Sequence, residues 1–525
     1  MQLNKSLLRP AVDRAHHWIC RLAVACLVAT TVIGTAACQS PTPGATTLHV
    51  TTREVVLDIV VTDKRGNFVD GLKKDDFTVL EDKVQQRVVY FQPPSSHTIP
   101  PDTSEVRSTA DLRNIGNAPV TILVLDELNT AFADMAFARG ALEKWLRRQP
   151  AKLQQPTVLL VASDEKFALL HDYTQDRDAL LSVLEKHFPS YPYRMSKGGS
   201  IGPDAGARMA MSLGSLMQIA EASGGTPGRK NIIWIGVGFP ALMLDDVSGT
   251  KEEEITQAAV RTIEVMLKAR ATLNVIDPTE MSDHSIDMNN PENLSLGTLQ
   301  SLQAPTSATQ SGYLNFNTFA PATGGILYAG RNDVDRQIEQ AINNGANYYT
   351  ISYSPANKNE NDAQFRNISV LMRDPRLTAT TRTGYYPEAR TNSNAIPAPP
   401  STHDLAFDLV SAALSSVVYN GLRIEGVASP NGFKLTIPLA DLQTHRSNNG
   451  QDIVEVTVMQ VCFDAKNKVL SHQAFELSSI ISADNLRQRQ VVFAVPGEKV
   501  PAGTKHIRFV VRDAVNEKIG TFDTK

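Results

Sequence analysis

Four short runs rich in valine, leucine and isoleucine constrain the fold of this 525-residue chain more than any other feature. They are Thr121–Leu125, Thr157–Val161, Asn231–Ile235 and Thr272–Ile276. Short runs that are apolar on both faces are typical of strands buried in a parallel sheet. Between the runs, apolar residues recur every three or four positions, which predicts helices. The alternation predicts an α/β fold with an open, doubly wound sheet covered by helices on both faces.

Proline-rich polar segments divide the chain into three folded parts. We expect a small β module over residues 50–95, an α/β domain over 118–390 and a C-terminal β-sandwich over 402–525, with immunoglobulin-like strand patterns in both β parts. Residues 279–318 are too polar and too long for a compact connection, which predicts an insertion in the α/β domain. Tyr348–Tyr353 is expected to be an edge strand of that domain.

Residues 1–38 have the composition of an export signal. Basic residues precede the apolar stretch Leu22–Ala37, which is shorter than the roughly twenty residues that a bilayer-spanning helix needs. Small residues then lead to Cys38, and Ala36-Ala37-Cys38 resembles the lipobox of bacterial lipoproteins. We therefore predict export with lipidation of Cys38, and simple cleavage is the alternative.

Composition narrows the classes of function. A net charge of -4 with no long basic run after the N-terminus gives no reason to expect a nucleic acid partner. Three of the four cysteines belong to the export segment, so only Cys462 lies in the folded body and no disulfide framework can form within one chain. The sequence contains neither a G-x-S-x-G nor an H-E-x-x-H motif, and we expect no enzymatic activity.

The residues after the first apolar run carry the most informative motif. Asp126 ends that run and Thr130 follows four positions later, so the segment resembles the D-x-S-x-S metal motif of von Willebrand factor A domains. Leu128 stands where the family has its middle serine, and Ser200 resembles the loop residue that donates a threonine hydroxyl. Ile235–Gly238 occupies the place of the family's final acidic residue.

The chain also resembles a more specific group, the acidobacterial von Willebrand factor A-related domain proteins. The likeness covers about residues 50–390 and implies the fold and export, but little about activity. The segments that carry it are Val61–Gly66, Asp75–Val79, Leu125–Thr130, Gly228–Trp234 and Asn347–Tyr353.

Loss of a serine and an acidic ligand leaves a magnesium site with few oxygens to compete with water. We therefore expect no cofactor, with magnesium as the alternative. Asp126, Asn129 and Thr130 are interpreted mainly as residues that bond the loop and start the next helix, and with Ser200 they form the candidate binding site.

Together these features predict an exported, non-enzymatic binding protein of the periplasm or outer membrane, or a secreted one. Its expected partner is a protein or envelope component, and its only expected contact with a membrane is the lipid anchor. Cation-dependent adhesion through Asp126 is the first alternative. A hydrolase and a structural envelope module are the others.

Overall fold

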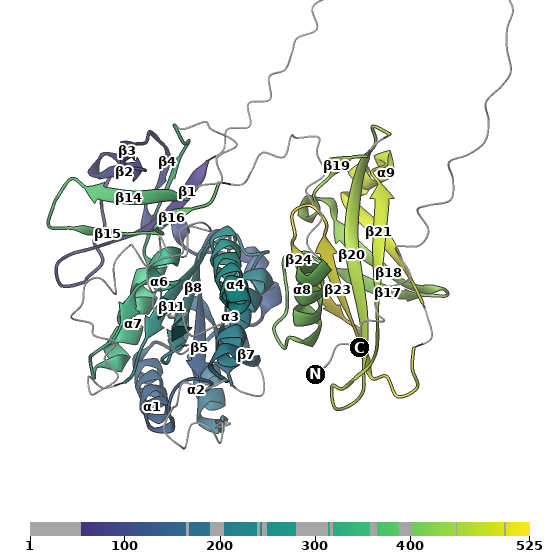
Figure 1. Cartoon of the computed structure of the whole chain (residues 1–525), viewed down its shortest axis with the longest axis horizontal. Helices are drawn as coiled ribbons and strands as arrows, with labels where there is room; N and C mark the ends of the chain where they lie inside the picture. The colour runs from purple at the N-terminus through teal and green to yellow at the C-terminus, as the bar shows by residue number, and fades with distance from the viewer. Residues whose placement is uncertain are drawn as a thin grey trace, which may run out of the picture. The chain divides into compact units, whose positions relative to one another are not determined.

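The computed structural model shows an α/β protein with several sheets (Figure 1). The residues that it describes lie between Glu54 and Thr524, with several gaps. The residues that it describes are 54–163, 167–189, 204–238, 242–243, 249–279, 313–314, 319–356, 365–387, 402–447, 449–497 and 500–524. The predicted export segment and most of the predicted insertion at 279–318 lie outside this set.

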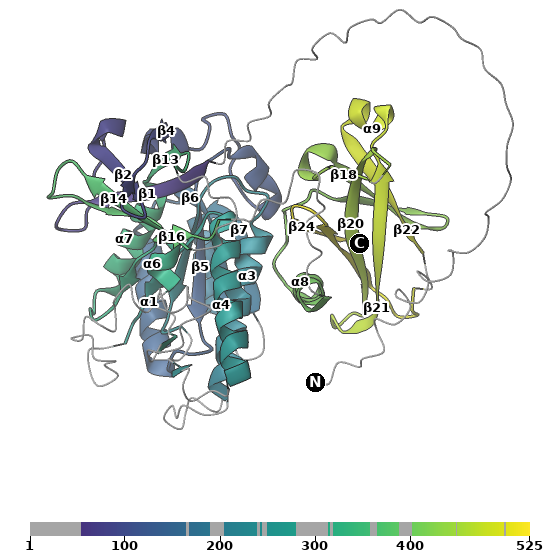
Figure 2. The ribbon, with the colours of Figure 1, turned by 45° about the horizontal axis from the view of Figure 1, so that its top comes forward.

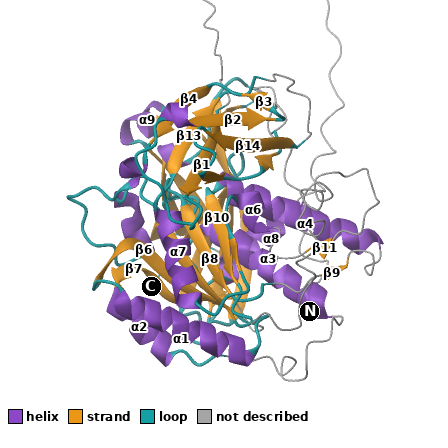
Figure 3. Ribbon diagram, turned by 90° about the vertical axis from the view of Figure 1, so that its left-hand side faces the viewer, coloured by secondary structure: helices purple, strands orange, loops and turns teal. Residues whose placement is uncertain are grey.

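A six-stranded sheet forms the centre of the α/β domain (Figure 3). Its strands, in spatial order, are β12 (Leu327–Tyr328), β10 (Ala271–Ile276), β8 (Lys230–Ile235), β5 (Val120–Asp126), β6 (Lys152–Ala162) and β7 (Phe167–Asp176). All four predicted strands are present and pair in parallel. The unpredicted β7 pairs antiparallel with β6, so the sheet is mixed rather than purely parallel.

Alternate residues along each strand bury against opposite layers of helices. On β5, Ile122 and Val124 face one core, whereas Leu123 and Leu125 face the other. This follows from the two-residue repeat of a strand and explains why the runs are apolar throughout. The first core contains α3 (Asp204–Ala222), α4 (Gly249–Lys268) and α6 (Phe319–Thr323), and the second contains α1 (Phe132–Arg148), α2 (Arg177–Lys186) and α7 (Val334–Ala346). Figure 2 shows α3 and α4 side by side.

The small β module is built from two distant stretches of the chain. It has two four-stranded sheets, each combining strands from both stretches. The first stretch supplies β1 (Val55–Thr62), β2 (Phe77–Glu81), β3 (Val84–Gln85) and β4 (Val88–Gln92), and the second supplies β13 (Tyr349–Tyr353), β14 (Arg366–Met372), β15 (Thr378–Thr380) and β16 (Gly384–Tyr385).

The prediction for Tyr348–Tyr353 is therefore wrong in its pairing. Strand β13 lies between β1 and β4, antiparallel to both, and is not an edge strand of the central sheet. Its core residues Tyr349, Ile351 and Tyr353 are fully buried against β1 and β2. Since pairing brings this stretch to residues almost 300 positions earlier, the α/β domain is inserted within the β module.

The C-terminal part consists of two further sheets around their own apolar core. One has β17 (Glu425–Ser429), β18 (Gly432–Pro438) and β22 (Gln490–Pro496); the other has β19 (His445–Arg446), β20 (Asp452–Phe463), β21 (Val469–Ile480), β23 (His506–Asp513) and β24 (Ile519–Asp523). Helices α8 (Thr402–Leu414) and α9 (Ala483–Gln488) were not predicted. Cys462 is buried with a free thiol. The immunoglobulin-like class of the two β parts stays a prediction.

None of the helices in the described ranges is both long and apolar enough to cross a bilayer.

Candidate functional site

The carboxyl end of β5 places Asp126 at the edge of the sheet where ligands of open α/β folds bind. The side chain is completely buried. Its Oδ2 accepts a hydrogen bond from the Gly238 amide at 2.7 Å, and its Oδ1 accepts one from the Asn129 amide at 3.0 Å. Because Gly238 follows β8 and Asn129 follows β5, the carboxylate joins the loops of two neighbouring strands.

Thr130 makes the second bond between these loops. Its buried hydroxyl accepts a hydrogen bond from the Val237 amide at 3.0 Å. Gly236, just before, has a φ of +142°, a region that favours glycine. A Cβ there would overlap the Thr130 hydroxyl and lie 2.5 Å from the Asp126 Cβ. The glycine is therefore required by the close approach of the two loops.

Asn129 connects the loop to helix α3. Its Nδ2 lies 3.3 Å from Asp126 Oδ1 and donates to the Ser212 hydroxyl at 3.1 Å. Ser212 is completely buried. Both bonds hold the side chain within the loop framework, which agrees with the structural interpretation of Asn129.

Glu127 and His187 form a pair that the sequence did not reveal. Glu127 is 1% exposed, and its Oε1 lies 2.7 Å from His187 Nε2. The imidazole follows α2 and stands 60 positions away in the chain, so no local spacing signals the pairing. The contact ties the end of α2 to the Asp126 loop.

The electrostatics of Asp126 follow from its burial. Loss of solvent raises the pKa of the carboxyl from 3.8 to about 6, and contact with the Trp234 indole and the Asn129 and Gly238 amides offsets only part of this effect. Neutral donors stabilise the carboxylate, but they do not replace the hydration that it loses.

This arrangement does not fit a magnesium ion. Magnesium requires oxygens that face it, whereas amide hydrogens from Asn129 and Gly238 point at the Asp126 oxygens. Leu128, at the serine position of the motif, is buried and apolar. Within the described ranges, no group of three or more His, Cys, Asp or Glu side chains is placed to hold a metal ion. The predicted donor Ser200 lies outside those ranges, so the expectation about metal stays a prediction.

The structure brings together three of the predicted site residues, Asp126, Asn129 and Thr130. Cys38, the predicted lipidation site, lies outside the described residues, as Ser200 does. Sequence reasoning missed Glu127, His187 and Ser212 because their partners are distant in the chain.

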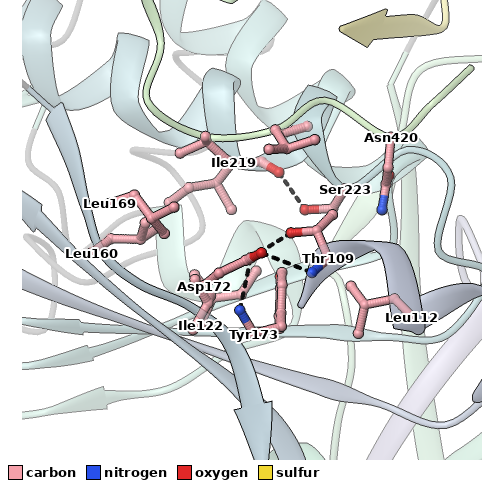
Figure 4. Close-up of a pocket in the computed structure, with 14 residues that line it drawn as sticks. Thr109, Leu112, Ile122, Leu160, Leu169, Asp172, Tyr173, Ile219, Ser223 and Asn420 are labelled. Atoms are coloured by element: carbon pink, nitrogen blue, oxygen red, sulfur yellow. Dashed lines mark hydrogen bonds between the residues drawn. The ribbon is translucent and has the colours of Figure 1, made fainter. Parts of the chain in front are cut away.

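A separate hollow beside β7 and α3 is too small to be a ligand site (Figure 4). Its volume is about 20 Å³, which is room for one water molecule. Asp172 at its wall accepts hydrogen bonds from the amide of Thr109 at 2.9 Å and from its hydroxyl at 2.5 Å. We interpret this hollow as a packing void.

Comparison with known proteins gives limited information. No family model and no curated protein matches the chain. Among solved structures, the SpRpn10 VWA domain is similar at a TM-score of 0.20 and 15% identity, over 30% of this chain and 74% of that domain. The pilus adhesin SpaC from Lactobacillus rhamnosus GG is similar at a TM-score of 0.27 and 8% identity, over 85% of this chain and 58% of its own. Such low scores carry no argument, and membership of the acidobacterial group stays a prediction.

Proposed function

We propose that this is an exported, non-enzymatic protein that binds another protein or an envelope component through the loops at the carboxyl edge of its central sheet. The observation that carries the proposal is a pair of exposed aromatic side chains on this edge. Phe132 is 61% exposed and Phe188 is 89% exposed. Large exposed aromatic residues are enriched where proteins bind one another.

Both rings stand on the hydrogen-bonded framework described above. Phe132 begins α1 two residues after Thr130, and Phe188 directly follows His187. The Val237 amide donates to the Thr130 hydroxyl and His187 bonds Glu127, and these contacts hold the segments that carry the two rings. A rigid support lowers the entropy lost when a partner binds. In this proposal the acidic residues are structural and the aromatic rings make the contact.

A capture experiment with the mature chain tests the proposal. The chain is immobilised, incubated with solubilised native membranes and compared with Phe132→Ser/Phe188→Ser. Leu486→Ser is the matched control, since Leu486 is 60% exposed on α9. We expect the double variant to lose the captured partner, and the control and EDTA treatment to leave capture unchanged. Capture that survives the double substitution contradicts the proposal.

Calorimetry separates this function from cation-dependent adhesion. We expect no binding of magnesium or manganese tighter than about millimolar, because amide donors surround Asp126. Micromolar affinity that disappears in Asp126→Ala would instead establish a working metal site. In that case EDTA should also abolish capture.

The anchor is a separate part of the proposal. We propose that Cys38 is lipidated and forms the mature N-terminus, on the strength of the small residues before it. Mass spectrometry of the native protein tests this directly. An unmodified N-terminus contradicts lipidation and leaves export in place.

A further inference from the structure

The amino edge of the central sheet, opposite Asp126, contains an excess of buried and partly buried positive charge. Asp58 on β1 provides a carboxylate in this region. Arg270, the residue before β10, donates to it through Nε at 3.1 Å and through Nη2 at 2.5 Å. The Thr350 hydroxyl donates to the same carboxylate at 2.9 Å. Arg270 therefore neutralises the charge of Asp58, and both carboxylate oxygens accept hydrogen bonds.

Two further arginines share this region. Arg229 is 2% exposed, donates through Nε to Thr272 at 3.0 Å and lies 5.2 Å from the centre of the Tyr348 ring. Arg382 lies over the Tyr385 ring at 5.6 Å. Both guanidinium groups interact electrostatically with Asp58, and burial lowers the pKa of each. Three guanidinium groups thus share one carboxylate.

Several donors of this cluster have no hydrogen-bond partner within the described ranges. They are Arg229 Nη1, Arg382 Nε and the Thr381 hydroxyl, and all three atoms are buried. An unpaired buried charge is costly, and buried donors are nearly always satisfied by protein, water or a bound ion. These three donors are therefore available to a water molecule or a small ion.

A cavity lies where two of these donors meet the ion pair. Its volume is about 30 Å³, which is enough for one or two water molecules. Its polar walls are Asp58, Arg270, Thr272, Thr323, Thr381 and Arg382. The walls come from β1, from β10 with the residue before it, from the end of α6 and from the segment that follows β15.

We propose that this cavity binds a monatomic anion of the chloride type. A water molecule can satisfy the Thr381 and Arg382 donors, but only an anion also offsets the surplus charge. The small volume favours a monatomic anion over sulfate, phosphate or an organic anion. Asp58 does not oppose the anion strongly, because its charge is already paired with Arg270.

The bound anion connects the β module to the central sheet. Asp58 and Thr381 belong to the β module, whereas Thr272 lies in the central sheet and Thr323 ends a helix packed on it. Removal of the anion leaves like charges facing one another at this junction, so its binding stabilises the attachment of the two parts.

The full mature chain serves for the test. Chloride is titrated against gluconate at constant ionic strength, and the thermal unfolding midpoint is followed together with the ³⁵Cl line width. We expect the unfolding midpoint to rise by about 2–4 °C and to saturate in chloride, and to stay unchanged in gluconate. We also expect chloride line broadening that bromide reverses.

Two variants and one control locate the effect. Arg382→Met and Thr381→Val should abolish or weaken both signals, whereas Arg373→Met, at an exposed position just after β14, should keep them. Equal midpoints in chloride and gluconate, or full chloride sensitivity in both variants, overturn the proposal. If Arg382→Met does not fold, Thr381→Val and the bromide competition still decide the outcome.

Discussion

The central sheet has a largely buried aspartate at each of its two edges, and the surroundings of the two aspartates shift their pKa values in opposite directions. At the carboxyl edge, Asp126 receives neutral amide donors, and burial raises its pKa to about 6. At the amino edge, burial also acts on Asp58, but the charge of Arg270 and its hydrogen bonds outweigh it and lower the pKa. The charge of the partner, rather than the depth of burial, therefore sets the direction.

The largest effect is expected at the amino edge. Asp58→Ala leaves the buried Arg229 and the partly buried Arg270 guanidinium groups without this carboxylate, and should lower the free energy of unfolding by about 3 kcal/mol. Urea denaturation at neutral pH measures this loss. The control is Asp374→Ala, which breaks an exposed pair with Arg376 and should have little effect. Equal losses in the two variants contradict the contrast drawn here.

A pH titration of stability should show the second largest effect. The pKa of Asp126 rises from 3.8 unfolded to about 6 folded, so the native state binds its proton more tightly. The stability gained is fully present below pH 3.8 and is lost as the pH rises towards 6, by about 3 kcal/mol in total. The contribution of Asp58 to stability depends on pH in the opposite direction. Because its pKa is lowered, Asp58 adds stability above pH 3.8, and this stability is lost as the pH falls further.

The variant Asp126→Asn isolates the contribution of Asp126 to the pH dependence of stability. The amide oxygen can still accept a bond from the loop, but the side chain no longer titrates. The difference in unfolding free energy between the variant and the wild type should therefore change between pH 4 and pH 6 and stay constant above it. A constant difference across that range shows that the folded pKa of Asp126 is not raised.

Gly236→Ala probes the close approach of the loops at the carboxyl edge. The new methyl group meets the Thr130 hydroxyl and the Asp126 side chain, and the φ of +142° adds strain. We expect a loss of about 2 kcal/mol in chemical denaturation. Gly140→Ala in α1, where a Cβ meets nothing within 4 Å, should instead stabilise by about 0.5–1 kcal/mol. The same sign for both substitutions would contradict this account.

The smallest effect on stability is expected for the exposed ring. Phe188→Ala should change the free energy of unfolding by less than about 0.5 kcal/mol, because the side chain is 89% exposed. Denaturation of this variant, set beside the capture experiment, separates binding from folding. A large loss of stability would show that Phe188 packs against the protein and does not serve a partner.

The sequence predicted the central layer well because its signals are local. A run such as Thr121–Leu125 carries both the length and the composition of a buried strand. The pairing of β13 with β1 could not be predicted this way, since Tyr353 meets Val55 only through the fold. Strand β7 was also missed, because its second half is mostly polar and it lacks the continuous apolar composition of its neighbours.

The same limit applies to the sites. The position of Asp126 at a strand end was visible in the motif, and so was the loss of a ligand at Leu128. The Glu127–His187 pair and the cationic cluster at the amino edge depend on residues brought together from several elements. Two basic residues at the start of an apolar strand, Arg229 and Lys230, were the only local sign of that cluster in the sequence.

The insertion of the α/β domain within the β module has a consequence for synthesis. Asp58 and its partner Thr350 are 292 positions apart, and a ribosome adds roughly 5–20 residues per second. Strand β1 therefore waits about 15–60 s before β13 exists, with its apolar residues and backbone groups unpaired. During that interval the nascent segment is a natural target for chaperones. The β module can complete its sheets only after the α/β domain has been synthesised.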